Sequence, residues 1–226
     1  MNKWIRRKRN SLGFGVQSPT DFYFVQHVLR EVSPYYAYAE LEKAEKNFRA
    51  DLPHYPEKIN KLLFRLANYI HPEVIVEVGT GSGLSAYAMS MARSLGKCVT
   101  INEYPTIASI ATEVRSILSH LPQITVEYGD ERKLFEQLLA TIGTIELLHV
   151  AHTPHYKEVV ALALQHISDK ALIIIEDIYN DKEKRTWWKE LCNNPLTGIC
   201  YDMDCIGLLL IAPSRSKNTY WIDFKE

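Results

Sequence analysis

Three alternating glycines mark the segment of this chain best suited to hold a ligand. Gly79, Gly81 and Gly83 follow an apolar, β-branched run at residues 74–78 and precede a helical pattern that begins at Leu84. This order predicts a buried strand, a tight turn and a helix N-terminus. Glycine accepts a positive φ and has no Cβ, so a ligand can lie against bare backbone N–H groups at the positive end of the helix. We expect the ligand to be a nucleotide-like cofactor.

Glu77, two residues before the first glycine, favours one kind of cofactor over another. The pattern E-x-G-x-G-x-G resembles the first motif of class I S-adenosylmethionine (SAM) dependent methyltransferases, in which the acid faces the methionyl ammonium. Residues 81–86 also fit the dinucleotide pattern G-x-G-x-x-G/A, and Glu103 follows at a suitable distance. A carboxylate at Glu77 would repel a pyrophosphate, whereas it suits a cationic sulfonium amino acid. A methyltransferase is therefore favoured over a nucleotide-dependent oxidoreductase, and a glycine turn without a ligand ranks third.

Strand and helix patterns alternate after the glycine turn. The strand patterns lie at residues 98–101, 124–128, 145–150 and 171–175, with helical patterns between them. This alternation predicts an α/β fold with a doubly wound, mostly parallel sheet. Residues 198–201 and 206–211 are close enough in sequence to pair as a hairpin, which brings the expected total to seven strands.

Ahead of the glycine turn, the sequence predicts a basic arm and a helical extension. Ser18, Pro19 and Asp21 form a helix start signal, and further helical patterns follow. We expect this extension at residues 1–57 and a SAM-binding methyltransferase domain at residues 58–226. The basic arm is typically a solvated, frayed terminus, although it could also touch an anionic surface. It contains Lys3, Arg6, Arg7, Lys8 and Arg9.

From about residue 58, the order of five βα units and a terminal strand pair resembles the Rossmann-like methyltransferase fold. The catechol and caffeoyl-CoA type of O-methyltransferase has the nearest pattern, because its first motif runs E-x-G-x-x-x-G-x-S-A like residues 77–86 here. The resemblance implies that Ser85 holds the cofactor carboxylate and that Gly129 and Asp130 meet the adenine, although Asp130 would equally suit a helix cap. The implied cofactor-binding set is Glu77, Gly79, Thr80, Gly81, Gly83, Ser85, Asn102, Glu103, Tyr104, Gly129, Asp130 and Ala151.

Two positions depart from that family. Its ribose-binding acid corresponds to Asn102, and Glu103 follows one residue later. Adjacent strand residues face opposite ways, so Glu103 reaches the ribose only if the strand has already ended, while the Asn102 amide would bind it more weakly. The acid that ligates Mg²⁺ in metal-dependent members corresponds to Ala151, which cannot bind a metal. Because only Glu176 and Asp177 remain at the end of the fifth strand pattern, we expect no divalent metal.

Three histidines cluster around the end of the fourth strand pattern. His149 falls within that strand, while His152 and His155 lie on either side of a proline, so their spacing does not imply convergence on zinc. Ligands bind at the carboxyl edge of such sheets, so His152 or His155 could act there as a general base or a substrate contact. A polar loop that happens to be rich in histidine fits the same residues.

The sequence therefore predicts SAM-dependent methyl transfer to a small molecule, at oxygen and without a metal. The sulfonium is an activated donor, so the protein mainly aligns the nucleophile and excludes water, and it needs a base only for a protonated acceptor. The catalytic candidates are His152, His155 and Asp177. The alternative, a non-catalytic SAM-binding or regulatory relative, is favoured by Ala151 and Asn102. The aromatic residues of the extension would cover the acceptor site or form a homodimer contact; they are Phe22, Tyr23, Tyr35 and Tyr36.

Composition and charge argue against several other classes of protein. A net charge of −1 over 226 residues argues against a general nucleic-acid binder. No apolar segment reaches membrane-spanning length and no signal-peptide pattern follows the basic arm, so we expect no membrane partner and a cytoplasmic location. The four cysteines lack C-x-x-C spacing, which is typical of reduced structural thiols.

Overall fold

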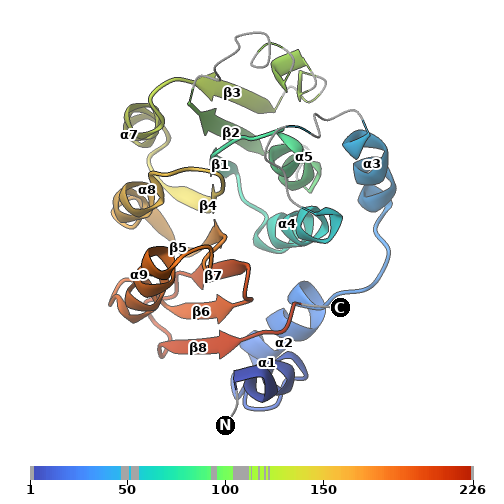
Figure 1. The fold of residues 1–226 in the computed structure, drawn as a ribbon, viewed down its shortest axis with the longest axis vertical. Helices are drawn as coiled ribbons and strands as arrows, with labels where there is room; N and C mark the ends of the chain where they lie inside the picture. Colours follow the sequence, from blue (N-terminus) through green and yellow to red (C-terminus); the bar gives the residue numbers. More distant parts are fainter. Residues whose placement is uncertain are drawn as a thin grey trace. The chain divides into compact units, whose positions relative to one another are not determined.

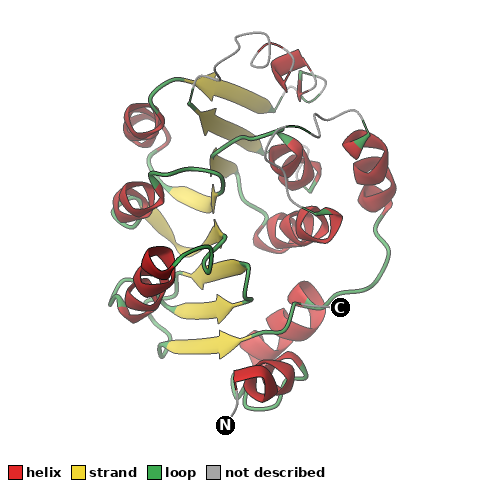
Figure 2. Cartoon of the chain, in the orientation of Figure 1, coloured by secondary structure: helices red, strands yellow, loops and turns green. Residues whose placement is uncertain are grey.

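The chain divides into two compact units. The computed structural model describes residues 3–46, 51, 56–92, 96–103, 112, 114–116, 118–119, 121 and 123–224. The central unit comprises residues 33–168, and the terminal unit combines residues 1–32 with residues 169–226. Figure 1 labels the helices and strands, and Figure 2 colours them by type. The sequence-based boundary after residue 57 stays a prediction.

The central unit contains four parallel strands in the order β3-β2-β1-β4. They are β1 (Val74–Val78), β2 (Lys97–Asn102), β3 (Ile124–Tyr128) and β4 (Ile145–Val150). β1 pairs with both β2 and β4, and all but its first residue are buried, which explains its nearly continuous apolar sequence. The strand order reverses between β1 and β4, and in open α/β sheets ligands bind at the carboxyl ends of the strands beside such a reversal.

Helices cover both faces of these four strands. Figure 1 shows α7 and α8 on one face and α3, α4 and α5 on the other. Their bounds are α3 (Tyr36–Glu45), α4 (Glu57–Ile70), α5 (Leu84–Met91), α7 (Glu131–Ile142) and α8 (Tyr156–Ala163). Leu41, Phe64 and Ala88 form a common core for α3, α4 and α5, so the helix that follows the glycine turn is fixed by packing. Tyr104 and most of residues 105–118, where a helical pattern follows the strand pattern at residues 98–101, lie outside the described residues.

The terminal unit contains strands in the order β5-β7-β6-β8. They are β5 (Ile167–Glu176), β6 (Ile199–Asp202), β7 (Ile206–Leu210) and β8 (Asn218–Trp221). β7 runs antiparallel to both β5 and β6, which confirms the predicted terminal hairpin. The described residues thus form eight strands, and the predicted total of seven is wrong. The additional strand, β8, is four residues long and alternates too briefly to be recognised, but it is fixed by parallel pairing with β6.

The N-terminal residues fold as part of the terminal unit. The helices of this unit are α1 (Lys3–Ser11), α2 (Pro19–Phe24), the π-helix η1 (Val25–Leu29) and α9 (Lys182–Asn193). Ser18 caps α2 by accepting the Asp21 N–H, as the start signal predicts. The interpretation of the basic arm as a frayed terminus is wrong for Arg7. Its buried guanidinium lies 2.5 Å from Asp202 Oδ1 and donates to the Ile222 carbonyl at 2.9 Å, so it satisfies acceptors on β6 and just beyond β8.

Asp21 joins α2 to β6 and β8. Its carboxylate is 2% exposed and accepts the hydroxyls of Tyr201 at 3.0 Å and Tyr220 at 3.1 Å. Arg215 donates to the same carboxylate at 2.6 Å. A buried charge is tolerated only with such partners, so this cluster fixes the second N-terminal helix on the C-terminal strands. None of the helices in the described part of the chain has the length and apolar character that a membrane crossing requires.

Candidate active site

The turn between β1 and α5 has three residues in the left-handed region. The φ angles are 98° at Gly79, 52° at Gly81 and 88° at Gly83, values that L side chains rarely adopt. At Gly79 a side chain is also excluded by lack of space, because a Cβ there would lie 2.6 Å from the backbone nitrogen of His152. The turn and the loop after β4 therefore touch, and His152 lies at the carboxyl end of β1.

The backbone hydrogen bonds of this turn hold its two ends. The Gly79 N–H donates to the Ile101 carbonyl at 2.8 Å, and the Gly83 N–H donates to the Thr80 carbonyl at 2.8 Å. Neither of these bonds uses the N–H groups of Gly81 or Ser82. Those two groups lie just before Gly83, the N-cap of α5, and backbone donors and the helix dipole at this end of a helix favour an anionic group such as a carboxylate.

Glu77 is the polar residue of β1, and its carboxylate is completely buried. Ser85 Oγ donates to Oε2 at 2.5 Å and Thr100 Oγ1 donates to Oε1 at 2.6 Å. His149 Nδ1 lies 2.8 Å from Oε2. In its ionised form Glu77 only accepts hydrogen bonds, and in that form the Nδ1 atom of His149 is the donor. Glu77 is thereby satisfied from three directions, as a buried charge requires.

These three donors come from the elements that surround the turn. Ser85 lies in the first turn of α5, and Thr100 and His149 are the register partners of Glu77 on β2 and β4. Thr80 Oγ1 lies 2.7 Å from Thr100 Oγ1, and since Thr100 uses its proton on Glu77, Thr80 is the donor. The Ser85 proton is likewise used on Glu77, so in this arrangement Ser85 does not donate to a cofactor carboxylate. Sequence reasoning missed Thr100 and the role of His149, because both depend on the register.

A second polar cluster brings together Glu103, Glu131 and His155. One possible ligand atom from each lies within 4.8 Å of the other two, and His155 Nε2 is 3.3 Å from Glu103 Oε1. The pKa of Glu131 is raised above its ordinary value. Burial is the largest cause, the hydrogen bond from Thr153 opposes it, and the nearby charge of Glu103 adds to it. Carboxylate and imidazole groups are ligands for divalent cations. Among the residues that the structure describes, this cluster is the one whose ligand atoms are close enough to hold such a cation. The predicted ribose acid and one predicted base are thus neighbours.

The other predicted cofactor residues lie around the ends of β2, β3 and β4. β2 ends at Asn102, so Glu103 meets the condition for reaching a ribose. The Gly129 N–H donates to the Asn102 carbonyl at 3.0 Å, and the Ala151 N–H donates to the Val78 carbonyl at 2.9 Å. Asp130 is the N-cap of α7 and accepts the Lys133 N–H at 3.0 Å, a bond that lowers the pKa of Asp130. The capping interpretation of Asp130 is therefore confirmed.

The acid pair at the end of β5 belongs to the terminal unit. Glu176 is fully buried, whereas Asp177 is exposed and has a φ of 54°. Burial lowers the pKa of Lys184, while the negative charges of Asp177, Glu176 and Asp181 act to raise it. The acid pair therefore has a lysine ammonium within electrostatic range, which offsets part of the negative charge that a hard cation would need.

Solved structures share this fold. TomG, an O-methyltransferase from Streptomyces achromogenes involved in tomaymycin synthesis and solved with SAM, matches at a TM-score of 0.60 and 21% identity over 94% of this chain and 99% of its own. An O-methyltransferase from Bacillus cereus, solved with S-adenosylhomocysteine (SAH), matches at 0.60 and 17% over 82% and 96%. The SAH-bound methyltransferase PaMTH1 from Podospora anserina matches at 0.59 and 15% over 86% and 96%. The predicted Rossmann-like methyltransferase fold is confirmed.

Comparison of the sequence with known families and proteins, by contrast, finds no match. No protein-family model matches the chain. No curated protein matches it either. The likeness to known proteins therefore lies in the fold.

Proposed function

We propose that this chain transfers the methyl group of SAM to an oxygen atom of a small-molecule acceptor without a resident metal. The observation that carries the proposal is the buried turn of three left-handed glycines at the carboxyl end of β1, followed directly by the N-terminus of α5. This turn lies where the strand order reverses, which is the ligand position of open α/β sheets. The SAM and SAH complexes of proteins with the same fold support this choice of cofactor.

The residues of the turn fit such a cofactor chemically. Glu77 supplies a buried negative charge for the cationic end of the amino acid, and the N–H groups of Gly81 and Ser82 suit its carboxylate. We assign Ser85 to orienting Glu77, because its hydroxyl proton is already donated there. Glu103 is the proposed ribose contact because it lies beyond the end of β2. Gly129 and Asp130 stay the proposed adenine contacts.

The cofactor would supply an activated methyl group, and the protein would supply orientation and a proton acceptor. Two histidines of the central unit are the proposed bases. The backbone of His152 lies against Gly79, and the His155 ring contacts Glu103, which would stabilise the imidazolium formed when His155 takes a proton. Asp177 is the third candidate. The acceptor is proposed to be a small hydroxyl compound in the cytoplasm.

Calorimetry with SAH and NAD tests the cofactor directly. We expect the wild-type protein to bind SAH and not NAD, and we expect Gly81→Val to abolish SAH binding. The control is Gly143→Val, because Gly143 also has a positive φ, of 76°, but a Cβ there meets nothing within 4 Å. It reproduces the backbone strain away from the turn. A folded Gly81→Val protein with wild-type affinity for SAH, or an NAD-binding wild type, would overturn the proposal.

A non-catalytic SAM-binding protein is the second candidate. Asn102, the last residue of β2, and Ala151, directly after β4, favour it, since each stands where the resemblance to the catechol and caffeoyl-CoA type of O-methyltransferase implies an acid. Incubation with SAM and a broad mixture of hydroxyl compounds, with detection of SAH, separates the two. SAH binding without turnover on any compound would favour the non-catalytic protein.

A further inference from the structure

The terminal unit contains a pocket of about 530 Å³ that no predicted cofactor residue lines. This volume lies within the range of small-molecule sites. One wall is a face of α9, where Arg185, Trp188 and Lys189 are spaced at i, i+3 and i+4. Arg6 of α1 and Trp221 of β8 line it as well. The pocket is thus built by segments from both ends of the chain.

Three cations give this pocket its charge. Arg6, Arg185 and Lys189 are exposed, and across the described residues none of them forms an ion pair with a carboxylate. Three such groups around one cavity create a local positive potential, which attracts an anionic ligand. The predicted ligand is therefore anionic.

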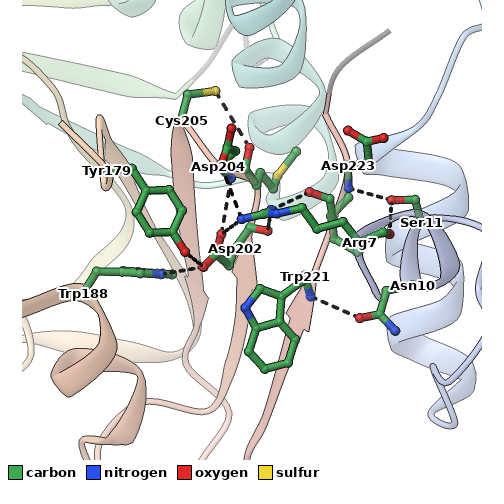
Figure 3. A network of polar contacts seen from close by, with 12 residues as sticks. Arg7, Asn10, Ser11, Tyr179, Trp188, Asp202, Asp204, Cys205, Trp221 and Asp223 are labelled. Atoms are coloured by element: carbon green, nitrogen blue, oxygen red, sulfur yellow. Dashed lines mark hydrogen bonds and ion pairs between the residues drawn. The ribbon is translucent and has the colours of Figure 1, made fainter. Parts of the chain in front are cut away.

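The acid of the pocket, Asp202, does not cancel this charge. Figure 3 shows Asp202 between Arg7 on one side and Tyr179 and Trp188 on the other. Arg7 lies 2.5 Å from Oδ1, Trp188 Nε1 donates to Oδ2 at 3.4 Å, and the Tyr179 hydroxyl donates to the same oxygen. Asp202 is thus paired with its own arginine, and the three lining cations stay in excess.

Each of the two arginines lies over an aromatic ring. The Arg6 guanidinium carbon lies 3.6 Å from the centroid of the Trp221 ring, and that of Arg185 lies 5.0 Å from the Tyr179 ring. Stacking uses the face of a guanidinium and leaves its in-plane N–H groups for an anion, and their fork matches two oxygens of a phosphate. Lys189 adds a point charge. This donor set favours phosphate over a single carboxylate.

The aromatic walls favour a ligand with a planar ring beside its phosphate. Trp221 and Tyr179 line the pocket and stay partly exposed beside the arginines that lie over them, and aromatic side chains contact heterocyclic rings favourably. Trp188 is fixed as a rigid wall, because its ring packs so closely on Gly207 that a Cβ there would lie 2.5 Å from it. We propose that this pocket binds a phosphorylated small molecule with a planar ring, of mononucleotide size. The proposal does not depend on methyl transfer.

Calorimetry with uridine 5′-monophosphate as the probe tests the proposal, since uridine is not a fragment of SAM. We expect the probe to bind, and Arg185→Gln and Lys189→Gln each to weaken it by about tenfold or more, as for a lost charged hydrogen bond. The matched control is Lys182→Gln, which removes a charge from an exposed residue of the same helix outside the pocket and should change nothing.

Inorganic phosphate and uridine alone separate the two parts of the ligand. We expect phosphate to bind more weakly than the nucleotide and uridine more weakly still. Absence of nucleotide binding, or equal weakening by Lys182→Gln, would overturn the site. Phosphate as tight as the nucleotide would overturn the ring contact, and uridine as tight as the nucleotide would overturn the anion contact. All three variants change exposed side chains, so melting temperatures near wild type confirm that they fold.

Discussion

At the scale of single residues, Glu77 is a buried carboxylate whose three donors come from α5, β2 and β4. Replacing Glu77 with Gln keeps its shape but puts an NH₂ group against donors. We expect the free energy of unfolding to fall by about 1–3 kcal/mol, the cost of buried groups without partners. Urea denaturation measures it, and Glu127→Gln, at an exposed carboxylate of β3, should be near neutral. Equal stability of the two variants would mean that the network does not stabilise the turn.

The base assignment is also a question about residues. If His152 or His155 accepts the proton, alanine at that position should lower turnover by about 10²–10⁴-fold and leave SAH affinity nearly unchanged. The wild-type rate should fall on the acid side, where the protonated ring cannot accept a proton. The measurement is a pH–rate profile with calorimetry on each variant. Turnover that survives both replacements would move the assignment to Asp177.

Residue types and spacing predicted the glycine turn, Glu77 and the cap at Asp130. They did not predict the partners of Glu77, because Thr100 and His149 are recognised only once β1 is aligned between β2 and β4. The register depends on packing over the whole sheet, and a shift by one residue would turn both side chains to the other face. For the same reason the contact between Glu103 and His155 could not be inferred from two loops 52 residues apart.

At the scale of elements, Tyr220 of β8 reports on the attachment of α2. Burial, followed by the charge of Asp21 and their hydrogen bond, raises the pKa of Tyr220 to about 12 from 10.0. Between these two values the unfolded chain has lost this proton and the folded chain keeps it. The folded state then binds more protons, so the free energy of unfolding falls as the pH rises through this window.

Tyr220→Phe keeps the ring and removes this titration. We expect its stability to fall less steeply than that of the wild type between about pH 10 and about 12, measured by urea denaturation at each pH. Tyr36→Phe is the control, because Tyr36 is completely exposed and should leave the slope unchanged. Parallel slopes for Tyr220→Phe and the wild type would contradict the coupling of Tyr220 to Asp21.

The order of the helices and strands could be predicted because hydrophobic periodicity and turn-forming residues are local features of the sequence. β3 and β4 begin and end at the predicted residues, and the hairpin of β6 and β7 forms where it was expected. β8 was missed because four residues carry too little pattern, and its place depends on pairing with β6. The role of Arg7 was missed because its partner, Asp202, lies 195 residues away.

At the scale of the whole molecule, the proposed chemistry and the second pocket use different sets of residues. The proposed cofactor residues come from the central unit, whereas the pocket joins Arg6 to the last strand of the chain. A sequence motif could point to the first because a strand, a turn and a helix are contiguous. No motif could point to the second, since its cations and aromatic rings meet only when both ends of the chain have folded.

Two sets of side chains bear on whether the proposed methyl transfer depends on a metal. Ala151 offers no ligand, and the Glu176–Asp177 pair has Lys184 nearby, so excess chelator should leave the rate of SAH formation unchanged. A chelator-sensitive rate restored by Mg²⁺ would contradict metal-free transfer. Restoration by Zn²⁺ alone would instead point to Glu103, Glu131 and His155. Glu131→Gln should then abolish the restoration, while Glu136→Gln, an exposed change on the same helix, should preserve it, because only the first removes a ligand.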